Sequence, residues 1–362
     1  MSGRLGLALL LFVSAAVSCV LPDFEKVEDD TNDPSRNKSD SGPDDMLTCP
    51  VELPLGSSCR KCIAANCCDQ AKTCAGDACG ADIRLPINPL TQVNDKFDAL
   101  ASCMLQHCDT EDTCNVRWGC VDNYIWPSLK RDHPFSMRVF NYADPREVGL
   151  PGVKVRMCES SDPLCAEGSG YVTTGTTDAS GNVDFTAPKG FNGYFQLSGG
   201  SPAPATVQWS QPVYDVVDSF NHQALTPTAV AGLAVTVGLH TRLDEPFEPN
   251  TGHLIARMQN CLPLRYLDSQ DPDRAGRARD VTFRFTPNGG ATKMYYVNDM
   301  ATLDTALDRT SWRGYAGAFQ VPPTNVTVTA KHAVTGQQLA SGTLTIRDGT
   351  IGFMYLVPNT SP

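Results

Sequence analysis

Cysteine crowding is the feature that most constrains what this chain can fold into. Eleven of the 15 cysteines lie between Cys49 and Cys120. Such density has two physical explanations: disulfides that staple a segment too small to bury its own core, or thiolates that hold a metal ion. Cys59 and Cys62 have the spacing of a zinc knuckle, but no second pair follows at a ribbon or finger distance, and no histidine lies between Cys59 and Cys103. We therefore expect a disulfide framework and no metal.

The N-terminus has the features of an export signal. Arg4 precedes an apolar run over residues 5–13 that is too short to cross a bilayer. The small residues 16–18 lead directly into Cys19, and this junction resembles the lipobox of bacterial lipoproteins. The resemblance implies a signal peptide over residues 1–18 and lipidation of Cys19, which would anchor the protein stably in a membrane. The alternative is an ordinary secretory signal in which Cys19 is incidental.

The segment that follows, residues 19–47, has the composition of an acidic, disordered tether. Residues 22–46 contain nine aspartates and glutamates against three lysines and arginines, and like-charge repulsion with few apolar residues disfavours a folded core. Val20 follows the cysteine where an aspartate would resemble the inner-membrane retention signal, so the outer membrane is favoured. The whole chain has a formal net charge of −11 and no basic patch, so no nucleic-acid partner is expected.

Residues 48–130, which contain the cysteine block, predict short helices. Ser57 or Ser58 is suited to cap a first helix that carries five residues, namely Cys59, Cys62, Ile63, Cys67 and Cys68. Asn94 or Asp95 is suited to cap a second. In spacing the segment resembles the small cysteine-rich helical modules of exported proteins from myxobacteria and related groups. That resemblance implies no activity.

From residue 135 the sequence changes to short alternating runs typical of β-strands. Residues 176–185 read TTDASGNVDF, in which Asp178 and Ser180 can bond the turn backbone and Gly181 can supply a positive φ. Residues 135–220 resemble the carboxypeptidase-regulatory or transthyretin-like β-sandwich, which implies a structural or binding module without catalytic residues. A related family closes its core with a lysine–asparagine isopeptide bond, but alternation places Lys154 on the solvent face.

The remaining segments predict a linking helix and a second sandwich. Residues 221–245 contain an apolar run after Thr226 and Pro227, with Gly238 as the stop signal. Strands are expected within residues 250–362, at 252–258, 281–285, 293–297, 315–321, 326–332, 342–346 and 351–357. The predicted fold class is therefore mainly β: a small disulfide-rich α-helical module followed by two transthyretin- or Ig-like β-sandwiches with a linking helix.

Cysteine parity predicts a long-range disulfide. Lipidation of Cys19 leaves 14 cysteines for disulfides, namely Cys49, Cys59, Cys62, Cys67, Cys68, Cys74, Cys79, Cys103, Cys108, Cys114, Cys120, Cys158, Cys165 and Cys261. A hairpin favours a local Cys158–Cys165 bond. The odd number in the block then predicts that Cys261 bonds to a block cysteine. The alternative pairs Cys261 with Cys158 or Cys165.

No catalytic constellation is evident. The six histidines are scattered among different elements, with no H-E-x-x-H, G-x-S-x-G or phosphate-cradling glycine motif. Asp268, Asp271 and Asp273 lack the twelve-residue pattern of a calcium loop, so a solvated acidic loop is the simpler interpretation. We predict that the protein is not an enzyme and carries no cofactor.

These features favour a lipid-anchored protein of the bacterial outer membrane or cell surface, acting as a structural or binding scaffold. Its expected partners are the membrane and either a cell-wall component or another protein. The alternative is a carbohydrate-binding or accessory module of a secreted hydrolase system. Four aromatic residues would discriminate, because a coplanar exposed platform favours sugar binding and buried rings favour a scaffold. They are Trp209, Tyr214, Trp312 and Tyr315.

Overall fold

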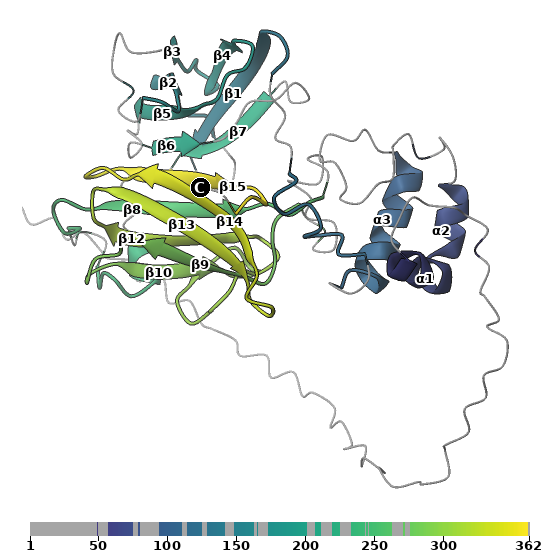
Figure 1. The fold of residues 1–362 in the computed structure, drawn as a ribbon. Coiled ribbons are helices and arrows are strands. Elements are labelled where there is room, and N and C mark those ends of the chain that lie inside the picture. The colour runs from purple at the N-terminus through teal and green to yellow at the C-terminus, as the bar shows by residue number, and fades with distance from the viewer. Residues whose placement is uncertain are drawn as a thin grey trace, which may run out of the picture. The chain divides into compact units, whose positions relative to one another are not determined.

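The computed structural model confirms the mainly β class with a disulfide-rich helical module (Figure 1). It describes residues 49, 57–74, 79, 94–110, 114–124, 129–141, 148–162, 165, 173–200, 207–210, 219–224, 233–242, 244, 246–262, 271 and 276–360. These all fall within one compact unit, Leu47–Pro362. The predicted signal peptide, Cys19 and the whole of the predicted tether lie outside the described residues.

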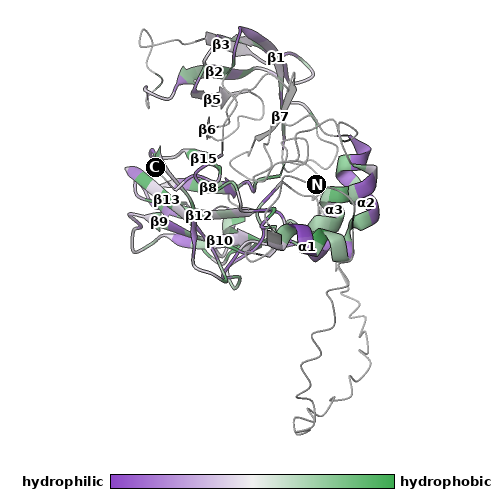
Figure 2. Cartoon of the chain, turned by 45° about the vertical axis from the view of Figure 1, so that its right-hand side comes forward, coloured by the Kyte–Doolittle hydropathy of each residue, from purple (hydrophilic) through white to green (hydrophobic). Residues whose placement is uncertain are grey.

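The helical module contains α1 (Ser57–Asn66), α2 (Cys68–Thr73) and α3 (Asp95–His107). The side chain of Asn94 caps α3 by accepting hydrogen bonds from the backbone N–H groups of Lys96 and Phe97 at 3.1 and 3.2 Å. Polar and apolar residues alternate along all three helices (Figure 2), and the buried side chains of α3 include Phe97, Leu100 and Met104. The single first helix that we expected is in fact two, because Cys67 leaves the helical conformation with φ −128°.

The first β region contains β1 (His133–Asn141), β2 (Val153–Glu159), β3 (Thr173–Thr176), β4 (Asn182–Ala187), β5 (Gly193–Gly199), β6 (Val207–Ser210) and β7 (Ser219–Ala224). The second contains β8 (Gly252–Met258), β9 (Val281–Thr286), β10 (Lys293–Val297), β11 (Leu303–Asp304), β12 (Tyr315–Val321), β13 (Asn325–His332), β14 (Gln338–Thr345) and β15 (Ile351–Leu356). Burial alternates along β2, where Val153 and Val155 are buried and Lys154 is exposed. The predicted solvent-facing position of Lys154 is confirmed.

The turn before β4 has the predicted chemistry. Asp178 Oδ1 accepts hydrogen bonds from the backbone N–H groups of Ser180 and Asn182, both at 2.8 Å. Gly181 has φ +82°, and a Cβ there would lie 2.4 Å from the Val139 carbonyl oxygen. Only glycine fits this position, because an added methyl group would meet backbone that cannot move aside.

The two β regions share one nine-stranded sheet, a connection that the sequence did not predict. Its strand order is β11-β10-β12-β8-β15-β6-β5-β2-β3. The last strand, β15, pairs in parallel with β8 on one side and with β6 on the other, and Figure 1 shows β15 between them. Two three-stranded sheets, β4-β1-β7 and β14-β13-β9, complete the architecture.

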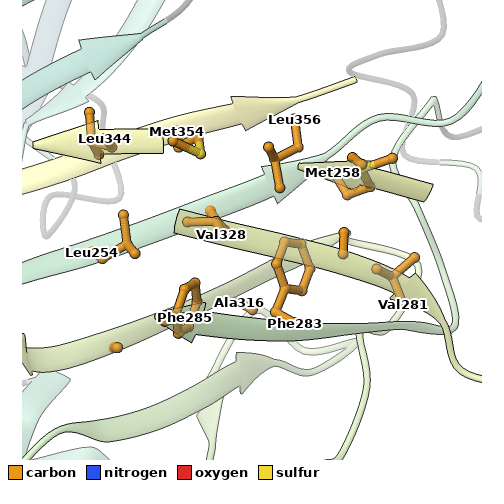
Figure 3. Close-up of a cluster of buried hydrophobic side chains, with 14 of the residues drawn as sticks. Leu254, Met258, Val281, Phe283, Phe285, Ala316, Val328, Leu344, Met354 and Leu356 are labelled. Carbon is orange, nitrogen blue, oxygen red and sulfur yellow. The ribbon is translucent and has the colours of Figure 1, made fainter. Parts of the chain in front are cut away.

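The two small sheets cover opposite faces of the long one. Phe353 on β15 is paired with Trp209 on β6, which is paired with Phe195 on β5. Phe195 and Phe353 both pack in the core of the first β region. The next residue of β15, Met354, lies in the core of the second region, between the two sheets with Leu254 and Phe285 (Figure 3). Successive residues of a strand face opposite sides, so β15 contributes to both cores.

The linking helix was expected within residues 221–245, and its predicted cap at Thr226 lies outside the described residues. Residues 219–224 form β7, which pairs in parallel with β1. Because β4 pairs with the other edge of β1, the backbone of β1 has hydrogen-bonding partners along both edges. Helical backbone is present at residues 233–236. The predicted stop is confirmed, because Gly238 has φ +66°. Ala234 and Val237 from this segment are buried in the core of the first β region.

Candidate functional site

Of the four aromatic residues that would discriminate sugar binding from a scaffold, the two whose side chains are described do not form an exposed platform. Trp312 is 8% exposed, and Tyr315 is half-buried. The backbone of Trp209 lies in β6 beside Phe353, but its side chain and the whole of Tyr214 lie outside the described residues. Buried rings favour a scaffold over a stacking surface for sugars, because stacking requires an accessible ring face.

Cations of the protein itself lie over these rings. The Arg257 guanidinium lies 5.3 Å from the centre of the Tyr315 ring and 4.9 Å from that of Tyr355, and it donates a hydrogen bond to the Tyr355 hydroxyl. Strand pairing explains this layering, because Tyr315, Arg257 and Tyr355 are aligned across β12, β8 and β15. Arg313 lies 4.5 Å from the centre of the ring of its neighbour Trp312. The contacts of Arg257 hold neighbouring strands together, and both arginines cover ring faces.

The structure brings together two histidines that appeared unrelated in the sequence. His240 and His253 both contact Phe247, with ring centroids 4.4 Å apart in each case. Both histidines are buried, at 4% and 7% exposure. Gln320 N–H donates to His253 Nδ1 at 3.4 Å, whereas neither ring nitrogen of His240 has a hydrogen-bond partner among the described residues. No sequence signal indicated this pair, since the two residues share no motif or helical spacing.

Burial, and to a smaller extent the charge of the nearby His240, lowers the pKa of His253 to about 4. The imidazole is therefore neutral at physiological pH, because the surrounding core disfavours its charged form. Two imidazoles are fewer than the three protein ligands of a catalytic zinc site. Within the described ranges, no group of three or more histidine, cysteine or acidic side chains could hold a metal ion. Of the three aspartates considered for calcium, only Asp271 is described.

Seven disulfides join the described cysteines in pairs. Six are Cys49–Cys68, Cys59–Cys114, Cys62–Cys108, Cys67–Cys103, Cys74–Cys79 and Cys158–Cys165. The seventh joins Cys120 of the block to Cys261, just after β8, across a sequence separation of 141 residues. This is the kind of long-range pair that cysteine parity predicted. It links the helical module covalently to the second β region.

The residues around this bond form what we call the clasp segment, Cys114–Tyr124. Within it, the Arg117 carbonyl accepts a hydrogen bond from Cys261 N–H at 2.9 Å, and the edge of Trp118 packs against the ring of His332. Asp122 Oδ1 accepts from both the hydroxyl and the backbone N–H of Thr360, at 2.7 and 2.8 Å. These hydrogen bonds from Thr360 lower the pKa of Asp122. The clasp segment thus holds the C-terminal residues that follow β15.

No helix in the described parts of the chain is long and apolar enough to span a membrane. Cys19, which the sequence predicts to be lipidated, lies outside the described residues.

Comparisons with known proteins identify no family. No protein-family model matches the chain, and no curated protein matches its sequence. Among solved structures, the chain resembles the Bacillus anthracis TIE protein at 14% identity, covering 62% of this chain but only 33% of that one, with a TM-score of 0.19. It also resembles the shaft pilin SpaA of Lactobacillus rhamnosus GG at 11% identity, covering 64% and 98% of the two chains, with a TM-score of 0.19. A third match is GBS52, the minor pilin of Streptococcus agalactiae, at 10% identity, 64% and 97% coverage and a TM-score of 0.15. At such values these similarities define neither family nor function.

Proposed function

We propose that this protein is a lipid-anchored scaffold of the bacterial cell envelope, with a structural or binding role and no catalytic one. Cysteine usage is the observation that carries the proposal. The seven disulfides engage all 14 cysteines other than Cys19. Disulfides persist in oxidising, extracytoplasmic compartments, which agrees with export. The remaining cysteine is the one at the signal-peptide junction, where a lipoprotein needs a thiol for acylation.

The architecture supports the scaffold role. A sheet shared by both β regions and a disulfide to the helical module resist relative movement of the parts. Two of the aromatic residues considered for a sugar-binding platform are described in the structure. Trp312 is buried, Tyr315 is half-buried, and arginines cover both rings. For this reason we favour the scaffold over a carbohydrate-binding module. We further propose that residues 135–220 are related to the carboxypeptidase-regulatory sandwich, a relation that the Asp178 turn supports.

The anchor is tested by changing Cys19→Ala in the full chain, expressed in a Gram-negative bacterium. We expect an uncleaved precursor that incorporates no radiolabelled palmitate, because the acylated thiol is missing. The measurement is label incorporation together with the mass of the N-terminal peptide. The matched control is the double variant Cys158→Ala/Cys165→Ala, which removes two other thiols and should label like the wild type. A Cys19→Ala protein that matures and labels normally would show that Cys19 is not the anchor.

A further inference from the structure

The three-stranded sheet β14-β13-β9 has one buried face and one exposed face. Its inward side chains, among them Phe283, Val328 and Leu344, lie in the core of the second β region (Figure 3). Because successive residues of a strand face opposite sides, the alternate residues point outward. These outward residues, which we call the hydroxyl face, are exposed or partly exposed, and they are Thr282, Arg284, Thr286, Asn325, Thr327, Thr329, Lys331, Ser341, Thr343 and Thr345.

Strand pairing arranges the hydroxyl groups of this face in rows. Thr327 of β13 is paired with Thr286 of β9 on one side and with Thr343 of β14 on the other. Side chains paired in this way lie about 4.5–5.5 Å apart at their Cβ atoms. The hydroxyl groups of Thr329 and Ser341, which are paired in the next row, form no hydrogen bond with any residue in the described part of the chain. They are therefore free to bond a partner.

Two cations lie on the hydroxyl face without an acidic partner. Arg284 is paired with Thr329, and Lys331 is paired with Thr282 on the same two strands, so the two cations are diagonal neighbours. Within residues 276–360, no ion pair or side-chain hydrogen bond engages either cation. The three strands contain no aspartate or glutamate, although the whole chain has 40 acidic residues against 29 basic ones. The face thus carries unneutralised positive charge on an acidic protein.

These properties favour one class of partner. The buried centre of a protein interface is rich in aromatic and other apolar side chains, and a surface that enters a lipid headgroup layer needs such side chains too. The hydroxyl face has neither aromatic nor aliphatic side chains. Two cations are also few for a nucleic acid, whose binding depends on neutralising many phosphates. A polysaccharide that carries carboxylates matches the face, because it offers hydroxyl groups and negative charges together.

We propose that the hydroxyl face binds an acidic polysaccharide, a chain of sugars that carry carboxylate groups. Arg284 and Lys331 pair with carboxylates of the polysaccharide, while Thr329 and Ser341 beside Arg284 hydrogen-bond its hydroxyl groups. This mode needs no exposed aromatic ring, so the burial of Trp312 does not oppose it. The proposal names a partner for the binding role proposed above and rests on that role, but it does not depend on Cys19.

Biolayer interferometry of the full chain tests the face, with immobilised alginate as the acidic probe and dextran as the neutral comparison. We expect saturable binding of alginate that weakens as sodium chloride is added, because salt screens exposed charges. Dextran should bind more weakly. Arg284→Gln and Lys331→Gln should each weaken alginate binding about threefold, the effect of losing one exposed ion pair. The matched control is Lys154→Gln, which removes an exposed lysine from β2 and should leave the dissociation constant unchanged.

Thr329→Val distinguishes a sugar site from a general effect of charge. Valine keeps both cations and suits a strand, but it removes one hydroxyl group, so alginate binding should weaken about threefold. Vesicles of phosphatidylglycerol test a lipid surface instead, and they should not bind through Arg284. Circular dichroism checks that each variant is folded.

Four results would overturn the proposal: no saturable alginate binding, equal weakening by Lys154→Gln, unchanged binding by Thr329→Val, or vesicle binding that is lost in Arg284→Gln. None of them bears on acylation of Cys19, which the palmitate experiment measures separately. Failure of the polysaccharide site is therefore distinguishable from failure of the lipid-anchored scaffold.

Discussion

Replacing Cys120 and Cys261 together with alanine is expected to lower the free energy of unfolding by about 4–5 kcal/mol, because the bond closes a very long loop. The two cysteines are separated by 141 residues, so the unfolded chain gains a large conformational freedom when the bond is lost. The clasp segment keeps its other contacts, including that of Trp118 with His332. The double variant should therefore still fold. Urea denaturation followed by near-ultraviolet circular dichroism measures the loss.

The Cys158–Cys165 pair provides the matched control, because it also removes one disulfide but closes a loop with a sequence separation of only 7 residues. Its replacement by two alanines should cost about 2–3 kcal/mol on the same loop-length relation. Equal losses for the two double variants would contradict the account, since loop length would then have no effect. A loss near zero for Cys120 and Cys261 would mean that the noncovalent contacts of the clasp segment suffice.

Acidification is expected to destabilise the protein through His253. Its pKa in the folded state is about 4, below the value of 6.5 for an unperturbed histidine. The unfolded chain therefore binds the proton first as the pH falls. The stabilisation is complete above pH 6.5, declines between pH 6.5 and 4, and is absent below pH 4. At about 1.4 kcal/mol per pKa unit, this loss is about 3 kcal/mol.

The measurement is the free energy of unfolding at a series of pH values between 7 and 4, for the wild type and two variants. His253→Gln should remove most of the decline over this range, because glutamine does not take up a proton. His107→Gln is the matched control, since His107 is exposed at the end of α3, and it should retain the wild-type profile. Carboxylates titrate in all three proteins, so only the difference between the profiles reports on the histidine. An identical decline in His253→Gln would show that the proton is taken up elsewhere.

Local sequence chemistry predicted many elements well. The expected strands 252–258, 293–297 and 315–321 coincide with β8, β10 and β12, because alternation of apolar residues between turn signals is a local property. The cap at Asn94 and the turn at Asp178 were also predictable, because each depends on one side chain that accepts hydrogen bonds from backbone N–H groups a few residues further on. By contrast, β7 was missed, since its sequence SFNHQA has no alternating apolar pattern. It forms a strand because β1 offers it a partner edge.

The candidate sites were less accessible to sequence reasoning. Trp312 and Tyr315 were singled out as aromatic residues, but two of the arginines over their rings, Arg277 and Arg257, come from segments distant in the chain. Likewise, His240 and His253 become neighbours only because both contact Phe247. Which side chains from distant segments come into contact depends on the tertiary structure, because paired strands can bring together residues at any separation in the sequence.

The sequence by itself determined the mainly β class, the positions of most strands and the need for a long-range partner for Cys261. Periodicity, turn chemistry and cysteine parity all operate without knowledge of the fold. Only the tertiary structure decided that Cys120 is this partner, that β15 inserts between β8 and β6, and that His240 and His253 both contact Phe247. The physical reason is that backbone hydrogen-bonding groups are the same in every strand. Their pairing is selected by packing of both sheet faces at once, which no local pattern specifies.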